Sequence, residues 1–383
     1  MAQSLRGATA IVGAATSGIG EAPGRESMDL AVEASIKALA ECGLGPRDVD
    51  GLFIALPTDK FSTLSLAEYL GIYPRIGDNN RVGGSSFLTY TEWAAMALQQ
   101  RRCDVALICY GSNQRTKAGK LVTNSELSPY EAPYHPRFPI TGYALAASRH
   151  MHQYGTTRAQ LAEVAVAARK WANLNPEAFA RGDLSIADCL NSRYVVEPLT
   201  VRDSCLVTDG GAAIVMVRAD RAKDCPKKPV YLLGAASATT HQSIASMADL
   251  TVSAAAQSGP RALADAGMSV RDIDIVELYD AFTINTILFL EDLGFCAKGE
   301  GGRFVSGGRI APGGVLPVNT NGGGLSCCHP GMYGLYTLVE AARQLRGEAG
   351  DRQVKGCEVA LCHGNGGVLS SQVTNILGTA ATL

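Results

Sequence analysis

The stretch ALAECGLGPRDVDGLFIAL, Ala38 to Leu56, recurs in altered form as ALADAGMSVRDIDIVELYD, Ala262 to Asp280. At a constant offset of 224 positions, seven of the first thirteen residues are identical. In both stretches an amphipathic helix is expected to end at a glycine, and a short acidic turn leads into an apolar strand. This agreement predicts an internal duplication of the fold.

Two more pairs of stretches support the duplication. TAIVGAA at 9–15 matches VYLLGAA at 230–236, and DVALICYGS at 104–112 matches EVALCHGNG at 358–366. We therefore expect one half at 1–225 and the other at 226–383. Each half alternates strands and helices, which favours α/β layers around a mixed sheet. The first half carries an extra segment at about 117–200, with a helix expected over 157–173, and such an insertion often covers an active site.

Composition narrows the class of protein. The 383 residues are 46% hydrophobic and 18% charged, with a net charge of −2, which gives no indication of a nucleic acid or an anionic membrane as partner. We find no apolar run long enough to cross a bilayer and no secretory signal, so a cytoplasmic protein is expected. The eleven cysteines include no Cys-x-x-Cys pair, which argues against a disulfide framework or a metal site.

The segment GAATSGIGEAPGR, Gly13 to Arg25, resembles a loop that binds a dinucleotide. However, Pro23 and Gly24 would disrupt the helix that must follow such a loop, and no tyrosine has a lysine four positions later. A dehydrogenase is therefore disfavoured. We expect a first strand at 8–12 and a flexible link over 17–25.

Two stretches hold candidates for binding and for acid–base chemistry. Gly83 and Gly84, followed by Ser85, precede a helix expected to run through Tyr90 to Leu98, and backbone N–H groups at a helix start favour a developing negative charge. Tyr279 and Asp280 lie where an apolar strand ends, a common place for reactive groups. The alternatives are a simple turn before a helix and a tyrosine that only packs.

Two later stretches add a histidine and a thiol. VNTNGGGLSCCHPGMYG carries His329 in a glycine-rich loop, where a neutral imidazole can donate to an oxyanion or move a proton. In ALCHGNGG, Cys362 closes an apolar strand and Gly366 lies in the expected glycine turn. A structural histidine and a buried, inert cysteine are the alternatives.

In this order the motifs resemble the thiolase superfamily, specifically its branch of sterol-carrier-protein-type and lipid-transfer thiolase-like proteins, over nearly the whole chain. The resemblance implies two duplicated βαβαβαββ halves in a five-layer αβαβα sandwich. It places His329 at the family's catalytic histidine, in an Asn-x-x-Gly-Gly…Gly-His-Pro loop, and Cys362 at its acid/base cysteine, in a Cys-x-Gly-x-Gly turn. Leu278 to Phe282 is similar to the branch's His-Asp-Cys-Phe segment, with Tyr279 in place of the histidine.

The chain departs from thiolases at the nucleophile. The position of the acyl-accepting cysteine falls on Gly83, give or take one residue, and no cysteine occurs between Cys42 and Cys103. Ser85 and Ser86 lie nearby, but a serine without a base is a poor nucleophile for a thioester. The acyl-cysteine step is therefore expected to be missing.

A glycine there and a tyrosine at 279 resemble the thiolase-like aldolases of bacterial steroid side-chain breakdown. The resemblance implies retro-aldol cleavage of a β-hydroxyacyl-CoA from a steroid or aromatic compound. In that reaction Tyr279 acts at the β-oxygen, and His329 donates to an oxyanion or carries a proton. Cys362 protonates the enolate, and the backbone near Gly83, Gly84, Ser85 and Gly366 completes the oxyanion site.

Coenzyme A would enter as part of the substrate, and no separate cofactor is expected. The branch also implies a homodimer and a separate small zinc-ribbon/OB-fold partner protein. Two other functions stay open, an acyltransferase (thiolysis or Claisen condensation) and a non-catalytic acyl-CoA-binding subunit.

Overall fold

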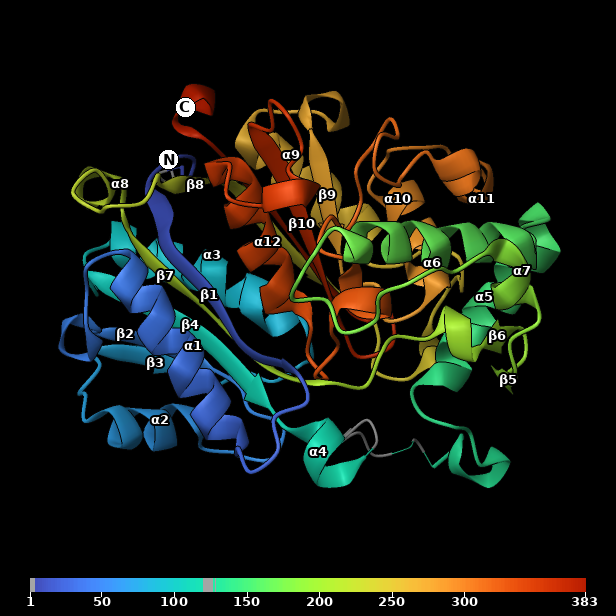
Figure 1. Cartoon of the computed structure of the whole chain (residues 1–383), viewed down its shortest axis with the longest axis horizontal. Coiled ribbons are helices and arrows are strands. Elements are labelled where there is room, and N and C mark those ends of the chain that lie inside the picture. Colours follow the sequence, from blue (N-terminus) through green and yellow to red (C-terminus); the bar gives the residue numbers. More distant parts are fainter. Residues whose placement is uncertain (1–3, 120–126, 128) are drawn as a thin grey trace.

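The computed structural model describes residues 4–119, 127 and 129–383, and its main feature is a nine-stranded mixed sheet with helices on both faces (Figure 1). The strands are β1 (Thr9–Gly20), β2 (Gly51–Ile54), β3 (Ile76–Asp78), β4 (Val105–Ser112), β7 (Asp209–Arg218), β8 (Val230–Thr239), β9 (Ile275–Leu278), β10 (Val359–Gly366) and β11 (Ser371–Gly378), with a separate small pair, β5 (Tyr194–Val196) and β6 (Leu199–Thr200). The helices are α1 (Ser27–Glu41), α2 (Ser62–Leu70), α3 (Ser85–Gln99), α4 (Gln114–Ala118), α5 (Ile140–Tyr154), α6 (Arg158–Asn173), α7 (Ile186–Leu190), α8 (Ala219–Ala222), α9 (Ala255–Ala266), α10 (Thr283–Asp292), α11 (Gly301–Val305) and α12 (Gly334–Arg346).

The order of the strands repeats along the sheet. It runs β3-β2-β4-β7-β1 and then β8-β11-β10-β9, so the second part follows the first in mirrored order. The two parts meet between β1 and β8 at only two residue pairs, Ala10 with Tyr231 and Ile11 with Val230. At the place in the second part that corresponds to β3, an isolated parallel bridge joins Val276 in β9 to Val318. The expected boundary at 225 and 226 falls between α8 and β8.

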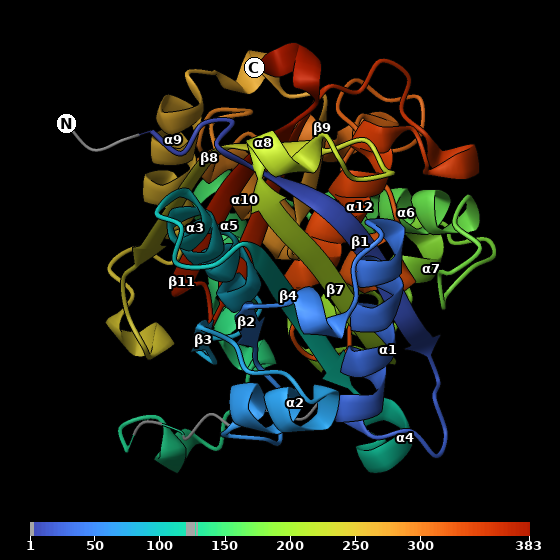
Figure 2. The ribbon, with the colours of Figure 1, turned by 90° about the vertical axis from the view of Figure 1, so that its left-hand side faces the viewer.

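Helices and strands form five layers. Helices α3 and α12 pack against each other and against strands of both parts of the sheet, so they form the central layer. Helix α1 covers the outer face of the first part, at β1, β4 and β7, and α9 covers β8 and β11 (Figure 2). The αβαβα sandwich expected from the sequence is confirmed.

The glycine-rich segment near the N-terminus differs from the expectation. We expected a flexible link from residue 17, but β1 continues through Gly20 and pairs with β7. Gly18 (φ +52°) and Gly20 (φ +102°) allow the irregular strand end, and Ser17 donates to the Leu30 carbonyl of α1 at 2.6 Å. Gly18 also lets the strand lie close to α1, because a Cβ atom there would lie 2.4 Å from Cδ2 of Leu30.

The extra segment of the first half lies beside the second half. Helix α6 confirms the helix expected at 157–173, and Thr157 caps it by accepting from the Gln160 N–H. Helices α5 and α6 pack against α10 and are the green helices on the right of Figure 1. Residues 120–126 and 128 of the expected insertion lie outside the described residues. The insertion thus supplies a wall for the region beyond the ends of β9 and β10.

Candidate active site

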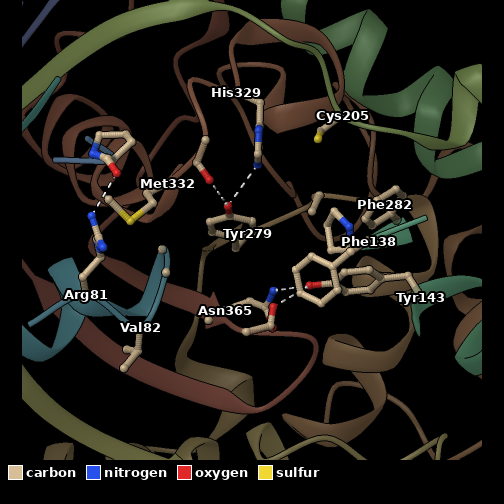
Figure 3. Close-up of a pocket in the computed structure, with 18 residues that line it drawn as sticks. Arg81, Val82, Phe138, Tyr143, Cys205, Tyr279, Phe282, His329, Met332 and Asn365 are labelled. Atoms are coloured by element: carbon tan, nitrogen blue, oxygen red, sulfur yellow. Dashed lines mark hydrogen bonds between the residues drawn. The ribbon is translucent and has the colours of Figure 1, made fainter. Parts of the chain in front are cut away.

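A cavity of about 250 Å³ lies where the glycine turn before α3, the end of β9 and the loop before α12 meet (Figure 3). Of the seven site residues expected from the sequence, five line this cavity: Gly83, Gly84, Tyr279, His329 and Gly366. An isolated bridge joins Gly83 to Gly366, and the Gly367 N–H donates to the Val82 carbonyl at 2.9 Å. Residues from both halves of the chain therefore build one site.

Tyr279 and His329 form a hydrogen-bonded pair in the wall of the cavity. The Tyr279 hydroxyl lies 3.0 Å from Nε2 of His329, and it also donates to the Gly331 carbonyl at 3.0 Å. The two rings meet edge to face, with centroids 5.4 Å apart. Nδ1 of His329 has no hydrogen-bond partner in the described part of the protein. Because a carbonyl oxygen only accepts, the phenol proton is directed to Gly331, and Nε2 of His329 donates to the Tyr279 oxygen. The phenol and the imidazole are thus in the direct contact that proton transfer between them requires.

Burial sets the charge of this pair. It raises the pKa of Tyr279 well above its ordinary value and lowers the pKa of His329 to about 4. Both side chains are therefore uncharged at neutral pH.

The loop before α12 fixes His329 in place. Asp280, next to Tyr279, accepts a 2.6 Å hydrogen bond from the Gly324 N–H in a π-helical turn at Gly323–Cys327. The backbone N–H of His329 donates to the Thr208 hydroxyl at 3.0 Å. Burial raises the pKa of Asp280 to about 7, and two loop N–H groups counter that rise. Single π-helical turns often occur at functional sites, and this one leads the chain into His329.

The glycines before α3 leave no room for side chains. A Cβ atom on Gly84 would lie 1.9 Å from Cε2 of Tyr279, and one on Gly83 would lie 2.9 Å from the Gly366 Cα. Gly83 also has a φ of +116°, which favours glycine. The ring of Tyr279 thus occupies the space that a side chain at residue 84 would need.

Cys362 and Ser85 do not line the cavity. Cys362 is fully buried in the middle of β10, and its thiol donates to the Thr337 carbonyl of α12 at 3.5 Å. The strand does not end at Cys362, as we had expected, but continues to Gly366. The hydroxyl of Ser85 donates to that of Ser371 at 3.1 Å, away from the cavity. The structure therefore brings Tyr279 and His329 together and leaves the thiol of Cys362 apart from them.

Four further polar residues line the cavity and were not predicted: Arg81, Tyr143, Cys205 and Asn365. Asn365 lies within the quoted ALCHGNGG motif, where the strand register was the missing signal. Cys205 is half-buried, and burial raises the pKa of its thiol. Tyr143 comes from α5, and no local pattern marks it.

A second, larger cavity of about 860 Å³ adjoins the first. The two share four lining residues: Arg81, Val82, Phe138 and Gly367. Many of the groups around the larger cavity are apolar, among them Leu145, Ile244, Met247 and Leu250. A compact polar site is therefore joined to a roomy, largely apolar one.

Similarity to known proteins shows the family to which the chain belongs. Residues 236–379 match the family model described as thiolase C-terminal domain-like. The steroid side-chain-cleaving aldolase of Thermomonospora curvata is 33% identical, over 99% of this chain and 96% of that protein. The chain belongs to the thiolase superfamily.

Two other relatives in the superfamily widen the comparison. An acetyl-CoA acetyltransferase of Methanothermobacter thermautotrophicus is 32% identical, over 96% of this chain and 98% of that protein. A solved structure titled "Ltp2-ChsH2(DUF35) aldolase" superposes with a TM-score of 0.89 at 34% identity, covering 98% of each chain. The sequence identity to an aldolase and to an acetyltransferase is thus nearly equal. It does not distinguish the two activities, so the distinction must come from the residues in the cavity.

Neither a metal site nor a membrane-spanning helix is found among the described residues. No group of three or more histidine, cysteine or acidic side chains there is arranged to hold a metal ion. Among the helices of that part of the chain, none combines the length and apolar character needed to cross a membrane.

Proposed function

We propose that this protein cleaves a carbon–carbon bond in a β-hydroxyacyl-CoA thioester by a retro-aldol reaction. The observation that carries this proposal is the ring of Tyr279 over Gly84 with its hydroxyl paired to His329. An acid–base pair occupies the space where a side chain at residue 84 would project. An aldol cleavage needs such a pair and needs no nucleophile.

The reaction balances without a co-reactant. For this step His329 takes its Nδ1–H tautomer, and the Tyr279 hydroxyl turns its proton from the Gly331 carbonyl to Nε2 of His329. The β-hydroxyl proton then passes to the Tyr279 oxygen while the phenol passes its own proton to Nε2. The electron pair of the O–H bond forms the carbonyl, and the pair of the Cα–Cβ bond moves into the thioester to give an enolate. The proton that His329 took up then returns through Tyr279 to Cα, which yields a shortened acyl-CoA beside the released aldehyde or ketone. Free coenzyme A is not consumed.

Acyl transfer is the second candidate, and the acetyltransferase relative favours it. It requires a thiolate that takes up the acyl group. Among the described residues, the thiol that lines the cavity is that of Cys205, and burial raises its pKa, so it stays protonated at neutral pH. A binding subunit without catalysis is less well supported, because it would not need the uncharged Tyr279–His329 pair.

The substrate is proposed to carry a bulky apolar acyl group, as in a steroid or aromatic side chain. The support is the larger, mainly apolar cavity that opens beside Tyr279 and shares Phe138 with the smaller one. The name of the aldolase relative agrees with such a substrate. Coenzyme A takes part as a portion of the substrate, and no separate cofactor enters the proposed reaction.

Two partners are part of the proposal. A separate small zinc-ribbon/OB-fold protein is supported by the similar solved structure, whose title joins Ltp2 to ChsH2(DUF35). A homodimer is supported by the edge strand β3 and by apolar side chains exposed near it, including Leu64 and Tyr73, which are 68% and 95% exposed. Burying such side chains favours association.

The test supplies the protein, with and without a candidate partner, with a β-hydroxyacyl-CoA in the absence of free coenzyme A. We expect an aldehyde or ketone and an equal amount of shortened acyl-CoA. A parallel reaction offers the matching β-ketoacyl-CoA with free coenzyme A. Cleavage in that reaction alone would overturn the proposal in favour of a thiolase.

A further inference from the structure

A second polar group lies in the cavity wall apart from the Tyr279–His329 pair. Asn365 is only 3% exposed, and its Nδ2 donates to the Tyr143 hydroxyl at 2.8 Å. Tyr143 in turn donates to the Gly367 carbonyl at 3.1 Å. Figure 3 shows these groups below Tyr279, on the other side from His329. The cavity is thus bordered by polar side chains on two sides.

The contact with Gly367 fixes the orientation of the Asn365 amide. A carbonyl oxygen only accepts hydrogen bonds, so Tyr143 directs its proton to Gly367. Burial raises the pKa of Tyr143 to about 12, so the phenol keeps that proton at neutral pH. Tyr143 must then accept from Asn365, and the amide presents its nitrogen, not its oxygen, to Tyr143.

A buried chain of hydrogen bonds holds the other end of this amide. Gln372 donates from Nε2 to the Asn365 Oδ1 at 2.6 Å, and Oε1 of Gln372 lies 2.8 Å from Nε2 of His363. Nδ1 of His363 lies 2.9 Å from the Thr374 hydroxyl. Burial lowers the pKa of His363 to about 4, so the ring is neutral and has one N–H, which it gives to Gln372. Each donor in the chain therefore faces an acceptor, and the chain allows one orientation of Asn365.

The nitrogen of Asn365 carries two hydrogens, and Tyr143 takes one of them. Within the described part of the chain, no other acceptor for this nitrogen is present. A retro-aldol reaction makes negative charge at two places, first on the β-oxygen and then on the thioester oxygen. Tyr279 and His329 serve the first, and the wall formed by Asn365 and Gly366 is available for the second.

We propose that Asn365 donates a hydrogen bond from Nδ2 to the thioester oxygen as this oxygen becomes an enolate, an inference that rests on the retro-aldol function proposed above. Asn365 is then a catalytic residue of the reaction, and Gln372 and His363 are positioning residues that act through it. A fixed donor in a water-poor site stabilises the enolate without having to reorient during the reaction.

The first experiment compares Asn365→Ala and Asn365→Asp with the matched surface control Asn191→Ala. We expect kcat for β-hydroxyacyl-CoA cleavage to fall by about 10²- to 10³-fold in both Asn365 variants, the effect of removing one oxyanion donor, with KM changed by less than about threefold. The control is expected to keep its kcat. Thermal unfolding and binding of the product acyl-CoA show whether each variant is folded.

The second experiment tests the positioning chain. In Gln372→Glu the new carboxylate still accepts from His363 but cannot donate to the Asn365 oxygen. The amide of Asn365 is therefore expected to rotate so that its oxygen and nitrogen exchange places. We expect a loss in kcat with little change in KM. The double variant Gln372→Glu/Asn365→Ala should be no slower than Asn365→Ala, because both changes act through one donor. If Gln372→Glu acted only by disturbing the structure, the double variant would be slower than Asn365→Ala.

The outcomes separate the two proposals. Wild-type cleavage without free coenzyme A, together with an Asn365→Ala variant that is folded and within threefold of wild type, overturns the role of Asn365 and leaves the retro-aldol function in place. A wild-type protein, supplied with its partner, that does not cleave any β-hydroxyacyl-CoA overturns both. A loss of kcat in the Asn365 variants, with product binding kept, supports the inference.

Discussion

The substitution Gly84→Ala tests the site with a single methyl group. Gly84 has a φ of −64° and a ψ of −23°, which alanine adopts without strain. The added Cβ would lie 1.9 Å from Cε2 and 2.4 Å from Cδ2 of Tyr279. The effect of the substitution is therefore expected to come from contact with the Tyr279 ring.

The size of the effect follows from these distances. Carbon atoms in contact prefer separations of about 3.5–4.0 Å, so the ring must move by at least about 1.5 Å. Such a shift breaks the 3.0 Å contact between Tyr279 and His329. A displacement of about 1 Å at a reacting group can cost about 100-fold in rate, and overpacking a core costs about 1–3 kcal/mol in stability. We expect kcat to fall by about 100-fold or more while the protein still folds.

The assay is steady-state cleavage of a β-hydroxyacyl-CoA, with urea unfolding as the measure of stability. Gly45→Ala is a matched control, because φ there is −128° and the nearest atom to its new Cβ is 3.9 Å away. Adding Gly84→Ala to Tyr279→Phe should lower kcat little further, since the methyl acts through the Tyr279 ring. A Gly84→Ala protein with wild-type kcat would refute this account of the site.

Four further predictions follow from the same structure. Tyr279→Phe removes the hydroxyl that acts at the β-oxygen, so kcat should fall by about 10²- to 10⁴-fold with the fold intact; a wild-type rate would remove Tyr279 from the mechanism. Cys362→Ala should keep kcat within about threefold, because the thiol faces Thr337 rather than the cavity. A loss in kcat with normal stability would instead support the acid–base role that the family resemblance implies for Cys362. The pKa values of His329 and His363 are lowered to about 4, so below pH 6.5 the unfolded chain binds protons that the folded chain does not. The free energy of unfolding should therefore fall from pH 6.5 to pH 4, by up to ~1.4 kcal/mol per pH unit for each histidine; urea unfolding of His363→Asn should show a shallower slope, and an equal slope would contradict the assignment. Leu64→Glu places a charge on the apolar surface beside β3 and should shift the protein toward monomer in light scattering, whereas an unchanged dimer would exclude this surface as the interface.

The fold could be predicted well because its signals are local and occur twice. The repeat at 38–56 and 262–280 joins a helix, a turn and a strand in each half, and the structure forms α1 and β2 in one and α9 and β9 in the other. Strand ends were harder to predict, because glycine is a weak strand former. Pairing with β7 and β11 extends β1 to Gly20 and β10 to Gly366.

The site could be predicted only in part. Tyr279 and His329 lie in motifs that mark a strand exit and a glycine loop, and the structure brings them together. The motif predicted Cys362 in the site, but the side chain of Cys362 does not line the cavity. Successive residues of a strand face opposite sides, and Asn365, three positions later in β10, is on the side that lines the cavity. Tyr143 comes from α5, more than 200 residues away in sequence, so the fold must be known before it can be found.

The intact mass of the acid-quenched protein during turnover tests the central claim, that carbon–carbon cleavage proceeds without an acyl-cysteine. The protein, with its partner, is quenched while it cleaves a β-hydroxyacyl-CoA and, in parallel, while it is exposed to the matching β-ketoacyl-CoA. The account predicts that the aldehyde or ketone appears from the first substrate and that the protein mass stays unchanged with both. An increase in mass equal to the acyl group, lost when one cysteine is replaced, would contradict it.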